Sequence, residues 1–111
     1  MGAKRSVAIS LRMAEPSEIA GSWVVEAGGR RCSVELSPER IESANAHRLL
    51  GGGDCLATMM PATPVGWRPA PDGIELVGAD RLTLAMFADA GDGSGVATLA
   101  DGRTARLRRA R

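Results

Sequence analysis

The chain has 111 residues, enough for one domain with a single hydrophobic core but too few for a core that also encloses a roomy ligand cavity. Its fourteen Lys and Arg balance thirteen Asp and Glu, so no global field favours nucleic acid or a membrane surface as a partner. No apolar stretch approaches the length of a membrane-spanning helix, so we expect no membrane span.

The first segment, residues 1–16, shows neither the helical nor the strand period, so we expect an extended N-terminal arm ahead of a domain over residues 17–111. Lys4 and Arg5 resemble the start of an export signal, but the apolar run behind them is short and Arg12 interrupts it. We therefore expect either that a signal was removed ahead of this numbering or that the protein stays inside the cell.

The residues after the arm predict one helical turn and then short strands. Ser17 is a candidate N-cap and Gly21 a stop for that turn. Cys32 and every second residue up to Leu36 are apolar, which predicts a half-buried strand with these side chains on one face. Residues 40–49 fit either a helical turn or a third strand.

Glycines and turn pairs divide the second half of the chain. Glycines 51–53 allow a tight turn into residues 54–59, which we expect to form a strand, so that both cysteines of the chain lie on strands. Asp72-Gly73 and Asp101-Gly102 are hairpin signals. About seven or eight short strands without a long amphipathic helix predict an antiparallel sandwich or barrel. An eight-stranded barrel would be just filled by its own side chains.

Cys32 and Cys55 are too few and too far apart for a zinc site, which needs four ligands in close pairs. A single disulfide is the favoured interpretation, and two buried thiols acting as small apolar core residues are the alternative. A redox-active site would need a close pair, which the spacing does not provide.

The chemistry of the remaining residues predicts neither an enzyme nor a cofactor or metal site. His47 is the one histidine of the sequence, and no nucleophile motif accompanies it. The arginines between Arg103 and Arg111 make the C-terminus basic, but stacking platforms for single-stranded nucleic acid are lacking, so we expect a solvated last strand.

Several motifs together resemble one known family. They are Gly21-Ser22-Trp23, Asp54-Cys55-Leu56 and the corner Trp67-Arg68-Pro69-Ala70-Pro71-Asp72-Gly73-Ile74. The series is similar to the bacterial metalloprotease inhibitors (Inh/Omp19 type), the periplasmic inhibitors of serralysin-type alkaline proteases, a family that also includes Omp19-type lipoproteins. The resemblance runs from about Ser17 to Leu107.

The resemblance implies an all-β fold, a compact eight-stranded antiparallel barrel like streptavidin and the lipocalins. It also implies a Cys32–Cys55 disulfide and barrel-packing roles for Trp23 and Trp67. The implied location is the periplasm. We expect a monomer, because short strands that end in Gly and Pro leave little exposed edge.

The resemblance further implies that the N-terminal arm plugs the cleft of a secreted, serralysin-like zinc metalloprotease. The matching arm residues are Ile9, Ser10, Leu11, Arg12 and Met13. Two departures stand out: residues 1–8 extend beyond the start of the family's arm, and Arg12 replaces an apolar residue. The alternative is a barrel of the cell envelope that binds another partner without inhibiting a protease, as an Omp19-type lipoprotein would.

Overall fold

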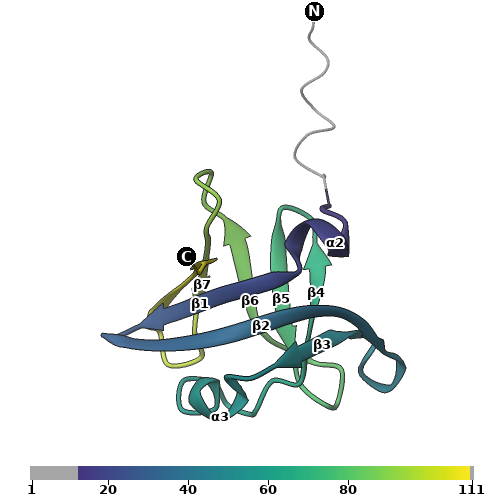
Figure 1. Cartoon of the computed structure of the whole chain (residues 1–111). Coiled ribbons are helices and arrows are strands. Elements are labelled where there is room, and N and C mark those ends of the chain that lie inside the picture. Colours follow the sequence, from purple (N-terminus) through teal and green to yellow (C-terminus); the bar gives the residue numbers. More distant parts are fainter. Residues whose placement is uncertain (1–12, 111) are drawn as a thin grey trace, which may run out of the picture.

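The computed structural model describes residues 13–110, which form a single closed barrel of eight antiparallel strands (Figure 1). Every strand pairs with its neighbours in sequence, and the first strand pairs with the last. The barrel predicted from the family resemblance is therefore confirmed, and the sandwich alternative is wrong.

Seven of the strands are short and β2 has twelve residues, and within residues 13–110 three small helical elements lie between or before them. In chain order they are α2 (Pro16–Ile19), β1 (Gly21–Ala27), β2 (Arg30–Ile41), the 3-10 helix η2 (Glu42–Ala44), β3 (Ala46–Leu50), α3 (Gly53–Leu56), β4 (Gly66–Ala70), β5 (Gly73–Val77), β6 (Thr83–Asp89), β7 (Gly95–Thr98) and β8 (Thr104–Arg109). The ambiguous residues 40–49 contain both of the predicted alternatives, a helical turn and the third strand.

Alternating side chains fill the barrel interior. On β2 the side chains of Cys32, Val34 and Leu36 are buried and those between them are exposed, as the period of two predicts. Across the ladder Val34 lies opposite Trp23, and Cys32 lies opposite Val25. The largest fully buried side chains are Trp67, Phe87, Leu36, Leu56, Leu76 and Leu107. The interior is thus a packed core.

The segment containing the second cysteine is a helical turn, and the prediction of a strand over residues 54–59 is wrong. Gly52 adopts a left-handed conformation, with φ of 75°, and its carbonyl accepts the backbone N–H of Leu56 at 2.8 Å. A side chain on Gly52 would collide with the Ser33 carbonyl of β2, so only glycine allows α3 to approach the barrel this closely. Leu56, fully buried, anchors the turn in the core.

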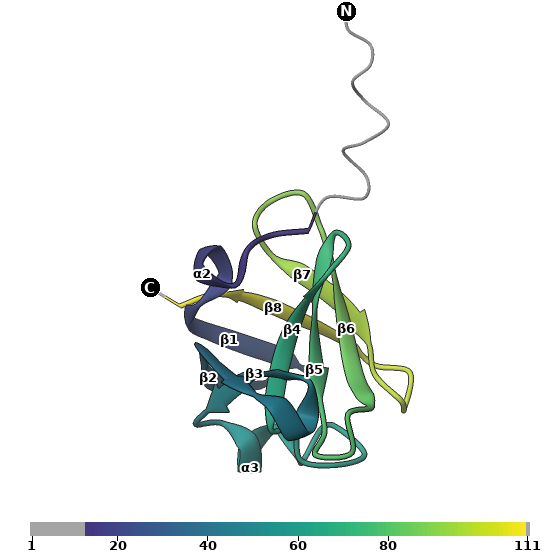
Figure 2. The ribbon, with the colours of Figure 1, turned by 90° about the vertical axis from the view of Figure 1, so that its right-hand side faces the viewer.

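A disulfide joins Cys32 of β2 to Cys55 of α3, with 5.7 Å between the two Cα atoms. The alternative of two free thiols is therefore wrong. The prediction that both cysteines lie on strands is wrong as well, because only Cys32 does. α3 covers one end of the barrel and α2 lies at the other, which Figures 1 and 2 show from two directions. Among residues 13–110 no helix is long and apolar enough to cross a membrane.

A charged cluster ties β1 to both of its neighbours. Glu26 of β1 accepts a hydrogen bond from Arg108 of β8 at 2.9 Å and forms an ion pair with Arg31 of β2, also at 2.9 Å. The Arg108 guanidinium holds the pKa of the Glu26 carboxyl below its ordinary value, and Arg31 acts in the same direction. The cluster therefore stabilises the seam between the first and last strands while Glu26 is ionised.

Candidate functional site

The base of the N-terminal arm is the short helix α2 at the mouth of the barrel. Pro16 occupies its first position, where a missing N–H is harmless, and the backbone N–H of Glu15 donates to Glu18 Oε1 at 2.9 Å. Glu15, and not Ser17 as predicted, is therefore the N-cap. The helical turn ends at Ile19, and Gly21, with φ of 133°, leads the chain into β1.

Three consecutive carbonyls at the end of α2 bond to two side chains of the barrel. The indole Nε1 of Trp23 donates to the Ile19 carbonyl at 2.8 Å. The Arg109 guanidinium donates from Nη1 to the Ala20 carbonyl at 3.0 Å and from Nη2 to the Glu18 carbonyl. Arg109 also stacks on Trp23, with its Cζ 4.4 Å from the ring centroid. We call Arg109 and Trp23 together the arm clamp.

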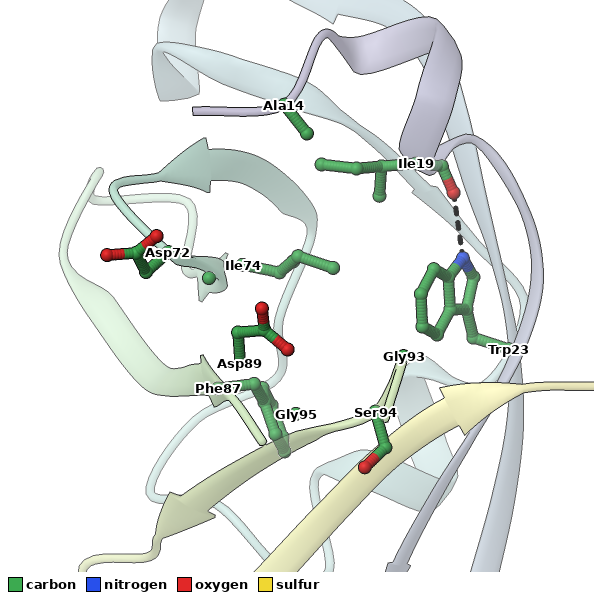
Figure 3. A pocket seen from close by; sticks show the side chains of 11 residues that line it. Ala14, Ile19, Trp23, Asp72, Ile74, Phe87, Asp89, Gly93, Ser94 and Gly95 are labelled. Carbon is green, nitrogen blue, oxygen red and sulfur yellow. Dashed lines mark hydrogen bonds between the residues drawn. The ribbon is translucent and has the colours of Figure 1, made fainter. Parts of the chain in front are cut away.

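Beside α2 the barrel opens into a hollow of about 300 Å³, the mouth hollow (Figure 3). Its lining consists of Ala14, Ile19, Trp23, Asp72, Gly73, Ile74, Phe87, Asp89, Gly93, Ser94 and Gly95. Ile19 and Trp23 face Ile74 and Phe87 across it. Its volume is at the lower limit for small-molecule sites. The hollow is open to solvent and is not an enclosed cavity in the barrel interior.

The rim of the mouth hollow carries acidic side chains from two loops. Asp72 lies in the turn between β4 and β5, and Asp89 ends β6. Asp92, in the loop between β6 and β7, accepts hydrogen bonds from the hydroxyl of Ser94 at 2.6 Å and from its backbone N–H at 3.0 Å. These two bonds hold the pKa of Asp92 below its ordinary value. The Arg106 guanidinium, which donates to Ser94 Oγ at 2.9 Å, lies beside Asp92 and acts on its pKa in the same direction.

The predicted arm residues lie mostly outside the described part of the chain. Ile9, Ser10, Leu11 and Arg12 precede it, whereas Met13 is described and is 52% exposed. Ala14, the next residue, packs against the core. The chain therefore reaches the surface at Met13, directly ahead of the clamped helix.

The two tryptophans are both buried, with 5% of Trp23 and none of Trp67 exposed, but they have different surroundings. Trp67 lies away from the arm, where its Nε1 donates to the Ser37 carbonyl at 2.9 Å. His47 stacks on it, with ring centroids 5.0 Å apart, and its Nδ1 is 3.0 Å from the Pro38 carbonyl. His47 is thus part of the packing around Trp67. Within residues 13–110 no group of side chains is arranged to hold a metal ion.

Sequence analysis missed Arg109, which we had expected on a solvated strand. Arginine 109 reaches the arm only because β8 pairs with β1, with Arg109 directly opposite Trp23. No local pattern contains that information. Together the filled barrel, the disulfide and the anchored segment around α2 define a small cross-linked scaffold that holds the base of the arm at its mouth.

Comparisons with known proteins identify the family. Residues 13–109 match the family model described as "Protease inhibitor Inh". A proteinase inhibitor of Dickeya chrysanthemi is 36% identical over 81 residues, which are 73% of this chain and 67% of the relative. An alkaline proteinase inhibitor of Photorhabdus luminescens is 38% identical over 98 residues, or 88% of this chain and 72% of the relative.

A further relative and a solved structure also match most of the chain. A proteinase inhibitor of Pseudomonas aeruginosa is 34% identical over 107 residues, or 95% of this chain and 82% of the relative. The crystal structure of a psychrophilic marine protease MP inhibitor superposes with a TM-score of 0.75 at 26% identity, covering 87% of this chain and all of that one. The chain therefore belongs to the Inh protease inhibitor family, a family of inhibitors and not of enzymes.

Proposed function

We propose that this protein inhibits a secreted zinc metalloendopeptidase of the serralysin type by inserting its N-terminal arm into the protease cleft. The observation that carries the proposal is the anchoring of α2: the chain emerges at Met13, 52% exposed, from a helix whose carbonyls are fixed to the barrel. The arm residues Ile9 to Met13 would be the part that enters the cleft.

A rigid barrel with one extended segment suits this role. Little conformational freedom is lost when a preorganised body docks, and an extended segment adds backbone hydrogen bonds and places alternate side chains in substrate pockets. A polar group at the end of the segment would occupy the open zinc position of the protease, which otherwise holds the attacking water. The protease would then be blocked without cleaving its inhibitor.

The periplasm is the compartment that best suits both the disulfide and the role. Disulfides persist in oxidising compartments and are rare in a reducing cytosol. An inhibitor in the periplasm would protect the producing cell from protease in transit to the outside. We expect the protein to act there as a monomer.

Titration against a serralysin-type protease tests the proposal. Three forms are compared: the full chain, a form that begins at Ile9 and a form that begins at Ala14. We expect the form beginning at Ile9 to abolish peptide hydrolysis at near-stoichiometric amounts, and the form beginning at Ala14 to inhibit poorly. The full chain should inhibit less well than the form beginning at Ile9, because a free amine cannot reach zinc from this position while residues 1–8 precede it.

Two controls separate inhibition from other effects. Added zinc should not restore hydrolysis, which excludes chelation, and a serine protease should be unaffected. Undiminished hydrolysis with both the full chain and the form beginning at Ile9 would refute the proposal. Capture of a different envelope protein from a periplasmic extract would then support the non-inhibitory barrel.

A further inference from the structure

The four-residue helix α2 depends on the barrel for its structure. Helices of this length are not stable alone, and the last carbonyls of any helix lack partners within it. Here the carbonyls of Glu18, Ile19 and Ala20 all accept hydrogen bonds from the arm clamp. The clamp side chains come from β1 and β8, the strands that close the barrel. The orientation of α2 is therefore set by the barrel seam.

Arg109 is well suited to hold two carbonyls at once. Its planar guanidinium offers several donors in a fixed fork, and stacking on the Trp23 ring limits its rotation. The end of β8 is fixed to β1, since Arg109 pairs with Trp23 and the backbone N–H of Ala110 donates to the Ser22 carbonyl at 3.0 Å. A Cβ on Gly21 would lie 3.0 Å from Arg109 Nη1, so glycine leaves the space that the guanidinium occupies.

We propose that Arg109 is a positioning residue for inhibition, which fixes the direction of the chain at the point where the arm leaves the barrel. This inference rests on the proposed function and extends it to a residue of the barrel outside the arm. Arg109 acts through α2 and need not touch the target. Without it the residues from Met13 to Ala20 would gain freedom that must be lost again on binding.

The size of the effect follows from that lost freedom. Fixing the backbone of one residue changes an equilibrium constant roughly tenfold, so freeing even one residue at the base of the arm should weaken inhibition about tenfold. We expect R109A to show this loss. R109K retains the positive charge but neither the planar group that stacks on Trp23 nor the two-pronged fork, so only the retained charge should make its loss smaller than that of R109A.

Arg103 supplies the matched control. It lies in the loop just ahead of β8, at the other end of that strand and beside Gly28, where it forms an ion pair with Asp101 at 2.7 Å. R103A makes the same change of charge without touching α2, and it should inhibit like the wild type. If R109A inhibits like the wild type, or if R103A weakens inhibition equally, the positioning role is refuted.

Two further readouts distinguish positioning from a general loss of structure or a direct contact. In R109A the amide of Ala20, which donates to the Pro16 carbonyl at 2.9 Å, should exchange with solvent faster, while the amides of β1 and β2 keep their protection. In the form beginning at Ala14, R109A should cause no further loss of binding. Unchanged exchange at Ala20, or further weakening in that short form, would overturn the proposal. Should R109A fail to fold, R109K is judged by the same criteria.

The outcomes also separate this inference from the proposed function. If neither the full chain nor the form beginning at Ile9 inhibits a serralysin-type protease even with Arg109 intact, the proposed function fails and the positioning role fails with it. If that form inhibits and its R109A variant inhibits equally well, only the positioning role is wrong.

Discussion

Removal of the disulfide should cost the barrel a large part of its stability while leaving the mouth intact. The bond joins residues 23 positions apart, and the chain-entropy relation for a loop of this length gives about 3.4 kcal/mol. Small domains have total stabilities of about 5 to 15 kcal/mol, so the loss is between about a quarter and two thirds of the total. The variant is C32A/C55A.

Equilibrium unfolding in urea, followed by the fluorescence of the buried tryptophans, measures this loss. With a slope of about 1 to 3 kcal/mol per molar urea, the midpoint should fall by about 1 to 3 M. Wild-type protein unfolded in the presence of a reductant should show a similar midpoint. Because α3 and the arm clamp lie at opposite ends of the barrel, the variant should still inhibit at temperatures where it remains folded.

If C32A/C55A unfolds at the same urea concentration as the wild type, the disulfide does not stabilise the protein by restricting the unfolded chain. Loss of inhibition by a fully folded variant would show instead that the two ends of the barrel are coupled. Either result contradicts the assignment of the disulfide to stability alone.

Three other changes test the packing and the charges. In G66A the new Cβ would lie 2.7 Å from a backbone carbonyl of β3, so we expect a loss of about 1 to 3 kcal/mol in urea unfolding. In W67F a fully buried indole loses its hydrogen bond to β2, which should cost about 2 to 4 kcal/mol by thermal unfolding. E26Q should make the free energy of unfolding less sensitive to acid. Arg108 lowers the pKa of Glu26 in the folded protein, so the ionised Glu26 contributes its full stabilisation above the ordinary carboxylate pKa of about 4. That stabilisation is lost as the pH falls through the lowered value.

Each of these changes has a comparison. G53A, whose Cβ would meet a Thr63 methyl at 3.4 Å and the Pro64 carbonyl at 3.7 Å, both in van der Waals contact, should be close to neutral, and equal losses for both glycines would contradict the steric explanation. For W67F, a loss below about 0.5 kcal/mol would mean that the indole is not part of the packed core. For Glu26, identical acid unfolding curves of E26Q and the wild type would mean that the ion pairs of β1 do not contribute to folding.

The strands were the predictable part of this fold because their signals are local. The alternation from Cys32 to Leu36 and the Asp-Gly pairs at residues 72–73 and 101–102 identify strands and hairpins from neighbouring residues alone. The closure of these strands into a barrel followed from the family resemblance. Alternation by itself left a sandwich equally possible.

The predictions that failed concern short segments and distant partners. Residues 54–59 are an apolar run too short for periodicity to separate a strand from a helical turn, and the left-handed Gly52 that begins α3 is dictated by its contact with β2. The prediction of a solvated last strand likewise missed the role of Arg109, because that role depends on partners distant in the sequence. Its role depends on carbonyls of residues 18 and 20, which only the pairing of β1 with β8 brings within reach.

The seam between the first and last strands also sets an order of events during biosynthesis. Arg109 and its acceptor Glu18 are separated by 91 positions, so a nascent chain cannot complete this bond until residue 109 has left the ribosome. Contacts of such long range form late and slowly. A translating or translocating chain would therefore close its barrel and fix the orientation of α2 only when β8 is in place.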